Sequence, residues 1–414
     1  MPTALPIDRN QQGAMTDFRH ANKDQLSLAL MDSRNHSLQL LVPFEAAGGP
    51  ALAAAARLLG HCGWFQEWWI GRNTQRQAGS NADCNATRLA SIDPHSDIEW
   101  GDDLTPDEVA SKSHAPDTAR LRAYLLETLE TTLELLEKAV QDDNDLYFFR
   151  LALFHEDRLA EQLLMLAQAE GLALKLPLPG PLRQREPLSI PATRWRNGID
   201  AGQGFAFDNE QPAFDEPVPE FEIDAHPVTW AQFVEFVDDG GYDNQALWHA
   251  QGWQWLTQAT LNDTRRAPRY VDQIGVGSGA VMQTRFGQAR RMLGGQVATH
   301  VSWFEADAWA RWAGRRLPAE VEWEVAAHVA QRRGFEWGDV WEWTASAFRP
   351  FEGFKPGPWA AYSQGAFSNG ALVTHRVLKG ASFATRARIQ SPRFRNFASP
   401  AQDDLFCGFR SCAI

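Results

Sequence analysis

The sequence predicts two unlike parts, an N-terminal four-helix bundle and a C-terminal α+β domain with little regular structure. Four segments before residue 172 carry apolar residues at three- and four-residue spacing, which is typical of amphipathic helices. The next stretch, LALKLPLPGPLRQREPLSIP, contains five prolines in twenty residues and indicates a semi-rigid linker. Beyond it, short strand-like runs alternate with turns rich in Gly, Pro, Asn and Asp. We therefore expect a multidomain α and α+β chain divided into 18–172, 173–192 and 193–414.

The four helices of the bundle are predicted over 24–46, 50–71, 117–142 and 146–171. Pro50 suits the start of the second helix and Gly171 the end of the fourth, because proline favours first turns and glycine favours helix ends. A long crossover must then join the second and third helices. The crossover, 73–116, is polar and too long for an idle loop, so we expect it to line a site.

In the second part, the runs FAFD, FEIDAHPVTW and THRVLKGASFAT predict strands, and two helices are expected near 229–238 and 303–314. The chain has 17 tryptophans against 5 tyrosines, and most of the tryptophans lie beyond residue 220. Tryptophan buries a large apolar area while its N–H reaches a nearby acceptor. Aromatic packing is therefore expected to hold this irregular domain together.

Composition excludes several functional classes. The formal net charge of −13 argues against a nucleic-acid or anionic-membrane surface, since phosphate binding needs clustered Lys and Arg. No apolar run reaches the roughly 18 residues of a membrane span, and the first residues carry no signal-peptide core. The four cysteines are too few and too scattered for a disulfide framework. We expect a soluble, cytoplasmic protein.

Two histidines are the candidate metal ligands. His61 lies in the second predicted helix and His155 in the fourth, and histidines on facing helices of a bundle are a common way to build a metal site. A second histidine at i+4 from His155 would share its helical face, but that position is Leu159. The carboxylates that directly follow His155 do not share its face either. An isolated helical histidine is more often a packed or surface group, so both interpretations stay open.

The second part carries long motifs: HVSWFEADAWARWAGRRLPAEVEWE, WGDVWEWTAS, VLKGASFAT, RFRNF and FCGFR. In order and spacing they resemble the formylglycine-generating-enzyme-like (sulfatase-modifying-factor) fold, a C-type-lectin-like domain. FAFDNEQP, HPVTWAQFVEFVDDGGYDNQALW and GWQW resemble its version in ergothioneine-type sulfoxide synthases. Those enzymes pair it with an N-terminal DinB-like four-helix bundle. The resemblance extends from about residue 20 to 414.

The resemblance implies non-haem Fe(II), held by three histidines in GHxxWFxE and HExxHxE motifs. It further implies use of O2 to join a sulfur or selenium donor to the imidazole of hercynine. DSRNHSLQLL, GHCGWFQEWWIGRN, LALFHED and DDLFCGFRSCAI are most similar to selenoneine synthases, whose donor is a selenosugar. The implied partners are thus hercynine, a selenosugar or thiol donor and O2, in a monomer or homodimer.

The ligand positions of the family carry over only in part. His61 matches the first iron ligand and His155 the second, while Leu159 stands where the third belongs. The alkyl chain of Leu159 has no atom that can donate to a metal.

The resemblance also marks substrate-binding positions. Asn396 in RFRNF matches an asparagine that helps to bind hercynine. We take its neighbour Phe397 as a substrate-binding residue as well. Arg158 occupies a place where relatives contact the substrate imidazole, although a cation there repels a divalent metal and a quaternary ammonium. Trp359 stands where relatives often have a tyrosine that donates a proton. Tyr362 lies close by and is the candidate catalytic residue, but it matches a different position.

Three interpretations remain at this stage. The first is a working iron oxygenase whose third ligand is water or a residue elsewhere, such as His20, His36 or His95. The second is an impaired paralogue that binds hercynine-like molecules without oxidative chemistry, because of Leu159. The third is an interaction module that uses the lectin-like domain. We assign no copper-binding role to the cysteines of the terminal FCGFRSC.

Overall fold

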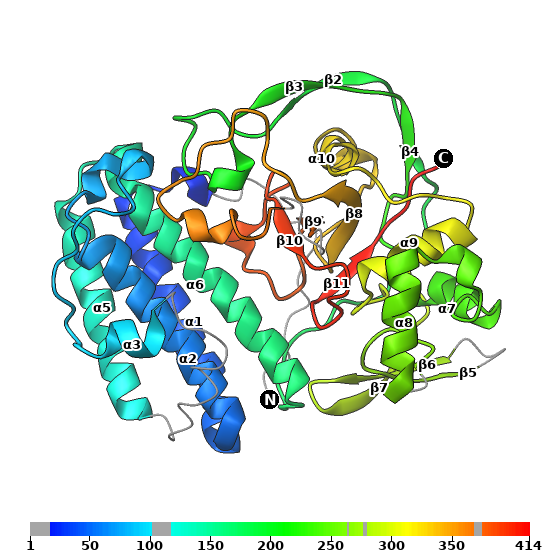
Figure 1. Ribbon diagram of the computed structural model, residues 1–414, viewed down its shortest axis with the longest axis horizontal. Helices are drawn as coiled ribbons and strands as arrows, with labels where there is room; N and C mark the ends of the chain where they lie inside the picture. The colour runs from blue at the N-terminus through cyan, green and yellow to red at the C-terminus, as the bar shows by residue number, and fades with distance from the viewer. Residues whose placement is uncertain (1–16, 102–116, 263–264, 276–279, 368–374) are drawn as a thin grey trace.

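The computed structural model describes residues 17–101, 117–262, 265–275, 280–367 and 375–414. Its first part is helical, as the sequence predicts, and its second part mixes strands and helices (Figure 1). The first part contains four long helices: α1 (Lys23–Ala47), α2 (Gly49–Gln66), α5 (Thr118–Lys138) and α6 (Asp143–Ala169). Helix α1 packs against α6, and α2 packs against both α5 and α6. These bounds lie within three residues of the predicted ones, except that α2 ends five residues before the predicted end and α5 four residues before it.

Local sequence signals explain where the helices begin. Asn22 caps α1 by accepting from the backbone N–H of Gln25, whose side chain bonds back to the N–H of Asn22. Asp117 and Asp142 are the N-cap residues of α5 and α6, and the side chain of each accepts from a backbone N–H three residues later. Gly171 follows α6 with a φ of +64°, the left-handed conformation that glycine adopts without strain.

The second helix does not stop at Gln66 but continues as a π-turn, Glu67–Gly71, labelled η2. Such turns are rare and often occur at functional sites. The crossover then forms a 3₁₀ segment, η3 (Arg76–Asn81), and a short helix, α3 (Ser96–Trp100), which packs against α2. Its remaining residues, 102–116, lie outside the described part of the chain.

Among its described residues, the second part contains four small sheets. The largest has the strand order β10-β9-β8-β11, with β11 parallel to β8 and the other neighbours antiparallel. The strands of this sheet are β8 (Trp341–Ala347), β9 (Arg376–Gly380), β10 (Asn396–Ala398) and β11 (Cys407–Phe409). The other sheets are formed by β1 (Leu188–Ile190) with β4 (Phe221–Ile223), by β2 (Thr193–Asn197) with β3 (Phe214–Val218), and by β5 (Val271–Gly275), β6 (Ala280–Arg285) and β7 (Gln288–Met292).

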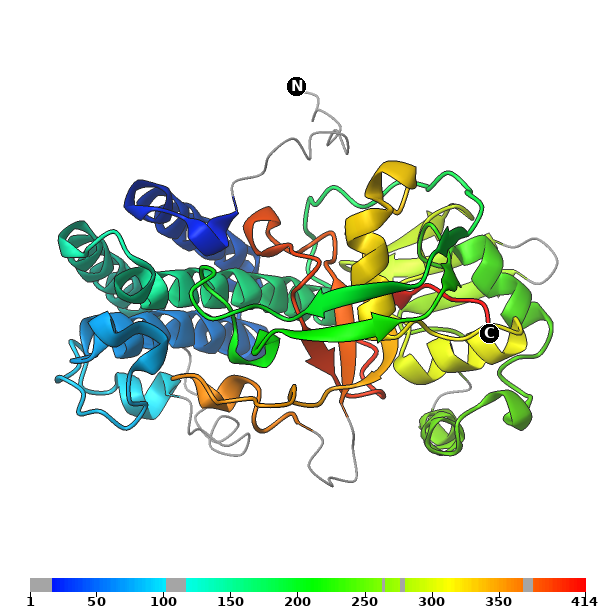
Figure 2. The same ribbon diagram turned by 90° about the horizontal axis from the view of Figure 1, so that it is seen from above.

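Helices and a long ribbon complete the domain. The β2–β3 ribbon runs across helix α10 (Figure 2). The helices are α7 (Trp230–Asp238), α8 (Ala250–Asn262), α9 (Trp303–Trp312) and α10 (Glu320–Val329), and short 3₁₀ turns include η4 (Asp208–Glu210), η5 (Gln245–Leu247), η6 (Gln331–Arg333), η7 (Ala360–Tyr362) and η8 (Ala387–Ile389). The aromatic core expected from the composition is present, with Trp230, Trp323 and Trp343 fully buried.

Several predictions for this part need correction. FAFD is not a strand. The ring of Phe205 packs against α6, and the backbone pairs with no strand, since the N–H of Phe205 donates to the carbonyl of Arg19 and that of Phe207 to the side chain of Glu210. FEIDAHPVTW forms strand only in β4, and the helices α8 and α10 were not predicted. The end of the predicted linker forms β1. The linker is not a free tether either: the N–H of Leu182 donates to the carbonyl of Gly295, and Gln296 donates to the carbonyl of Pro179.

One apolar core extends through both parts. Phe154 of α6 contacts Phe205 of the second part, with ring centroids 5.2 Å apart. Figure 1 shows α6 on the side of the bundle that faces the second part, next to β10 and η7. Within the described ranges, no helix combines the length and apolar character needed to cross a bilayer. Helix α6 therefore contributes to a core that the two parts share.

Candidate functional site

The structure brings the two predicted metal ligands together. His61 on α2 and His155 on α6 lie with their ring centroids 5.1 Å apart. The Nδ1 of His61 is 2.8 Å from the backbone carbonyl oxygen of Trp100. Because a carbonyl can only accept, Nδ1 carries the proton and donates, which makes Nε2 the nitrogen with the lone pair. The crossover helix α3 thus fixes the tautomer of His61.

His155 is a buried imidazole, only 4 % exposed. Burial holds its pKa well below the usual value, and the nearby His61 and Arg158 lower it further. The ring is therefore neutral at pH 7. A neutral imidazole is the form that donates a lone pair to a metal.

Aromatic rings enclose His155. Phe65 stacks on it with a centroid distance of 3.7 Å and an interplanar angle of 5°. Trp359 meets the imidazole edge-on at 5.1 Å and contacts Phe65 at 4.8 Å. Water is therefore largely displaced from this side of the imidazole pair.

The remaining predicted site residues continue this row of rings. Trp359 stacks on Tyr362 at 4.9 Å, and Tyr362 contacts Phe397 at 5.5 Å. Arg158, one turn along α6 from His155, holds its guanidinium carbon 4.3 Å from the centre of the Tyr362 ring. Trp359 thus separates Tyr362 from the histidine pair. Six of the predicted positions form one continuous chain of contacts, although they come from α2, α6, η7 and β10: His61, His155, Arg158, Trp359, Tyr362 and Phe397.

Tyr362 is a neutral phenol. Burial raises its pKa to about 12, partly offset by the positive charge of Arg158. The hydroxyl therefore keeps its proton near neutral pH and is able to donate it. Asn396 begins β10 nearby, where its side-chain oxygen accepts from the backbone N–H of Phe397 at 3.0 Å.

The third ligand position contains no donor. Leu159 is buried and lies one helical turn from His155. Within the described part of the chain, no group of three His, Cys, Asp or Glu side chains is arranged to hold a metal ion.

The proposed replacements lie elsewhere. His20 is beside Asp17, His95 is beside Asp93, and His36 lines a separate cavity of about 530 Å³ with Arg386 and Arg388. The idea that one of these three histidines completes the site is therefore wrong for the described conformation.

Carboxylates on α6 have roles that the sequence did not reveal. Glu156 pairs with the buried Arg34 of α1 at 2.8 Å, and Asp157 accepts from Ser33 at 2.8 Å and from Arg388 at 2.6 Å. Glu161 accepts from three donors of the second part: Ser382 at 2.5 Å, Thr385 at 2.7 Å and Trp341 at 2.9 Å. These three carboxylates anchor α6 to its neighbours. Glu161 stands at the last position of the HExxHxE motif that begins at His155, but the motif gave no sign of these contacts.

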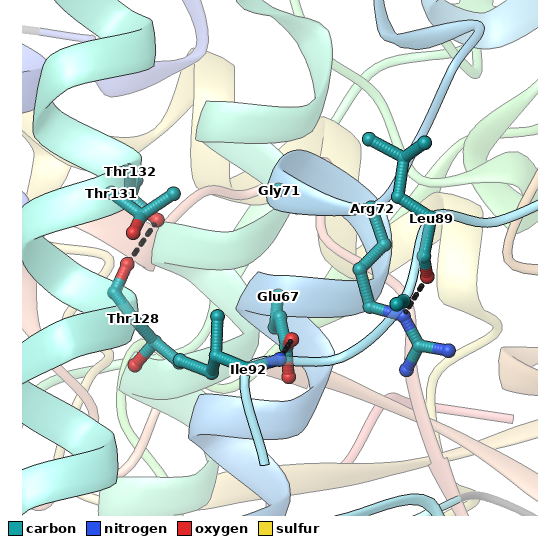
Figure 3. Close-up of a pocket in the computed structure, with 9 residues that line it drawn as sticks. Glu67, Gly71, Arg72, Leu89, Ile92, Thr128, Thr131 and Thr132 are labelled. Carbon is teal, nitrogen blue, oxygen red and sulfur yellow. Dashed lines mark hydrogen bonds between the residues drawn. The ribbon is translucent and has the colours of Figure 1, made fainter. Parts of the chain in front are cut away.

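The crossover closes over a cavity of about 100 Å³ within the bundle (Figure 3). Glu67, in the π-turn, accepts from the hydroxyl of Tyr124 at 2.6 Å and from the backbone N–H of Ile92 at 2.7 Å. Arg72 faces the same cavity and donates to the carbonyl of Leu89. The crossover thus lines a cavity built around Glu67 and not around the histidine pair, and its expected role in a functional site stays a prediction.

Comparisons with known proteins agree with the two-part architecture. Residues 180–339 and 336–413 match the family described as "Sulfatase-modifying factor enzyme 1-like domain". The chain is 30 % identical to a hercynine oxygenase of Mycolicibacterium thermoresistibile, over 96 % of each chain. It is 31 % identical to a hercynine oxygenase of Mycolicibacterium smegmatis, over 95 % of this chain and 98 % of that one. A formylglycine-generating enzyme of Streptomyces coelicolor is 33 % identical over 39 % of this chain and 54 % of its own length.

Proposed function

The chain belongs to the sulfatase-modifying factor enzyme 1-like family, and from this membership we propose that it is an O2-dependent oxidoreductase that acts on hercynine. Relatives named hercynine oxygenases match both parts of the chain, the helical one included. The observation that carries the proposal is the enclosed pair His61–His155, because the two imidazoles lie where the helical part meets the aromatic wall of the second part.

The proposed reaction forms a bond between hercynine and a chalcogen donor. A C–H bond of the hercynine imidazole and the Se–H or S–H bond of the donor are lost, and a C–Se or C–S bond forms. Together, the formation of this bond and the oxidation of the chalcogen to a selenoxide or sulfoxide release four electrons. One O2 accepts all four, with one oxygen atom retained on the chalcogen and the other leaving as water.

A selenosugar is the donor that we propose, as in selenoneine synthases. Ala398 is buried in β10 directly after Phe397. The resemblance to ergothioneine-type synthases implies that some of those enzymes carry an acidic residue at this position. An apolar methyl group offers no charge to pair with a peptide thiol, and it suits a neutral sugar better.

The side chains at the site fit Fe(II) in part. The half-buried imidazole of His61 lies edge-on to the buried imidazole of His155, and the tautomer of His61 is fixed by a carbonyl, which is a common arrangement for metal ligands. Leu159 offers no third donor, so His61 and His155 would hold the ion and leave its other positions to solvent or substrates. When bound, Fe(II) supplies the reactivity toward O2 that amino-acid side chains lack.

The chain's own residues position the substrate. The trimethylammonium of hercynine favours aromatic faces through cation–π contact. Arg158 already covers Tyr362, so we expect Trp359 and Phe397 to contact the ammonium group with the faces that do not stack on Tyr362 and Phe348. The like charge of Arg158 directs the ammonium group away from itself. Tyr362 retains its proton and is the proposed proton donor.

Anaerobic reconstitution with Fe(II), followed by metal analysis, tests the site. We expect His61→Ala and His155→Ala to lose the ion, while His36→Ala, which removes an imidazole from a different cavity, retains it. Wild-type protein that keeps less than about a tenth of an equivalent would refute the metal assignment. Leu159→His should raise the Fe(II) affinity, because it adds a third imidazole one turn from His155. Unchanged affinity would mean that position 159 does not face the pair.

Leu159 also supports a second candidate, a catalytically impaired paralogue that binds hercynine-like molecules without oxidising them. Calorimetry with hercynine, together with O2-consumption measurements in the presence of a selenol or thiol donor, separates the two. Binding without O2 uptake supports the impaired paralogue. No binding at about millimolar hercynine removes both candidates.

A further inference from the structure

Arg285, at the end of β6, is a buried cation without a carboxylate partner. It is 4 % exposed, and no carboxylate oxygen of the described residues lies within 4.0 Å of its guanidinium. Its terminal nitrogens donate to neutral acceptors, Nε2 of His300 at 3.3 Å and the hydroxyl of Thr299. Its Nε is buried and has no partner among the described residues. Buried arginines are normally paired, because an uncompensated charge in the interior is costly.

The charges around Arg285 do not compensate it. Burial and the nearby cation of Arg290 lower the pKa of Arg285 to about 10, which still leaves the group charged at pH 7. His300 is fully buried and accepts from Arg285, so its ring is neutral. Among the described residues, Arg285 therefore keeps its charge without a carboxylate paired directly to it, although Asp339 lines the same cavity.

Arg285 lines a small cavity. It measures about 20 Å³, enough for one water-sized or slightly larger occupant. Its other polar lining groups are Gln296, Thr299 and Asp339. Asp339 engages in another interaction and lies beyond ion-pair distance of Arg285. The linker closes the cavity with Leu178 and Pro179.

We propose that this cavity is a binding site for one small monovalent anion of chloride size, held by Arg285. An anion there neutralises the buried guanidinium and accepts from its unpartnered Nε–H. A carboxylate- or phosphate-bearing metabolite does not fit, because the cavity is too small. The linker would have to move before a larger ligand could enter.

The site lies at a junction between the two parts of the chain. Directly after Arg285, Phe286 and Gly287 form the tight turn from β6 to β7, with φ of +47° and +71°. The N–H of Phe286 donates to the side chain of Gln168 in the last turn of α6 at 2.8 Å. Occupancy therefore stabilises the hairpin that holds the end of the helix carrying His155.

The experiment compares chloride with gluconate at constant ionic strength, with thermal unfolding of the full chain as the readout. We expect the Tm of the wild type to rise with chloride. At ten times its Kd the anion multiplies the folded-to-unfolded ratio by about 11. Arg285→Met should abolish the response, whereas Arg290→Met, at an exposed cation on the next strand, should retain it.

A crystal of the wild-type protein grown or soaked in bromide gives a direct measurement that does not depend on a variant folding. We expect an anomalous peak in the cavity, in contact with Nε of Arg285. An ordered water alone at saturating bromide overturns the proposal, and so does a chloride response in Arg285→Met equal to that of the wild type.

Discussion

Replacing Gly60 by alanine tests how the crossover holds His61. A Cβ at position 60 would lie 2.3 Å from Nε1 and 2.4 Å from Cδ1 of Trp100. Ordinary contacts begin near about 3.4 Å, so the indole must move by about 1 Å. The carbonyl of the same residue fixes the Nδ1 proton of His61 at 2.8 Å. We expect the shift of Trp100 to weaken that bond.

Two opposing effects set the change in stability. Overpacking costs about 1–3 kcal/mol, while alanine in place of glycine within a helix contributes about 1 kcal/mol. The net loss is therefore no more than about 2 kcal/mol, and the protein still folds. Losing the partner that orients a metal-binding histidine lowers metal affinity about 10- to 100-fold. The effect on Fe(II) binding should thus greatly exceed the effect on folding.

Anaerobic Fe(II) titration and thermal unfolding of the same preparations check this expectation. Gly71→Ala is the matched control, because a Cβ there meets its nearest atoms, on Glu67 and Thr131, at 3.8 Å. This control should retain wild-type Fe(II) affinity. If Gly60→Ala is folded and binds Fe(II) within about twofold of the wild type, Trp100 does not position His61.

Three further predictions concern buried polar groups. Arg34→Met leaves the carboxylate of Glu156 buried without its partner and should cost about 3–5 kcal/mol in urea unfolding; a loss below about 1 kcal/mol would contradict this. Glu161→Gln replaces one carboxylate oxygen, which accepts hydrogen bonds, by an amide NH2 that donates, and should lower the free energy of unfolding by about 1–3 kcal/mol. Equal urea midpoints for the variant and the wild type would show that these hydrogen bonds make no net contribution to stability. Burial holds the pKa of His300 well below its usual value of 6.5, so the unfolded chain binds the extra proton and stability is lost as pH falls below about 6.5. In His300→Asn the free energy of unfolding should depend less steeply on pH, by up to about 1.4 kcal/mol per pH unit. Identical slopes in the variant and the wild type would refute the assignment of this dependence to His300.

The bundle was predictable because its apolar spacing persists over whole helices. The stretch around His155 keeps that spacing for more than six turns, and α6 runs over Asp143–Ala169. The second part was harder, since its strands are short and its rings pack without regular pairing. Phe205 and Phe207 suggested a strand, yet they serve the core between the two parts.

At the candidate site, sequence reasoning identified the residues but not their contacts. It placed His61 opposite His155, and the two rings do lie in contact, edge-on with centroids 5.1 Å apart. It did not find Phe65 stacked on His155 or the carbonyl of Trp100 on His61. Those contacts depend on side-chain rotation and on the path of the crossover, and neither leaves a periodic trace in the sequence.

The buried carboxylates of α6 have a consequence for modularity. The proline-rich stretch looks like the natural place to divide the chain into two independent halves. Asp157 and Glu161, however, are bonded to groups on the far side of that division. An isolated bundle would expose these acids together with the apolar surface around Phe154, and the other half would lose the acceptor of Trp341. The linker separates the two halves in sequence, but each half supplies part of the other's interior.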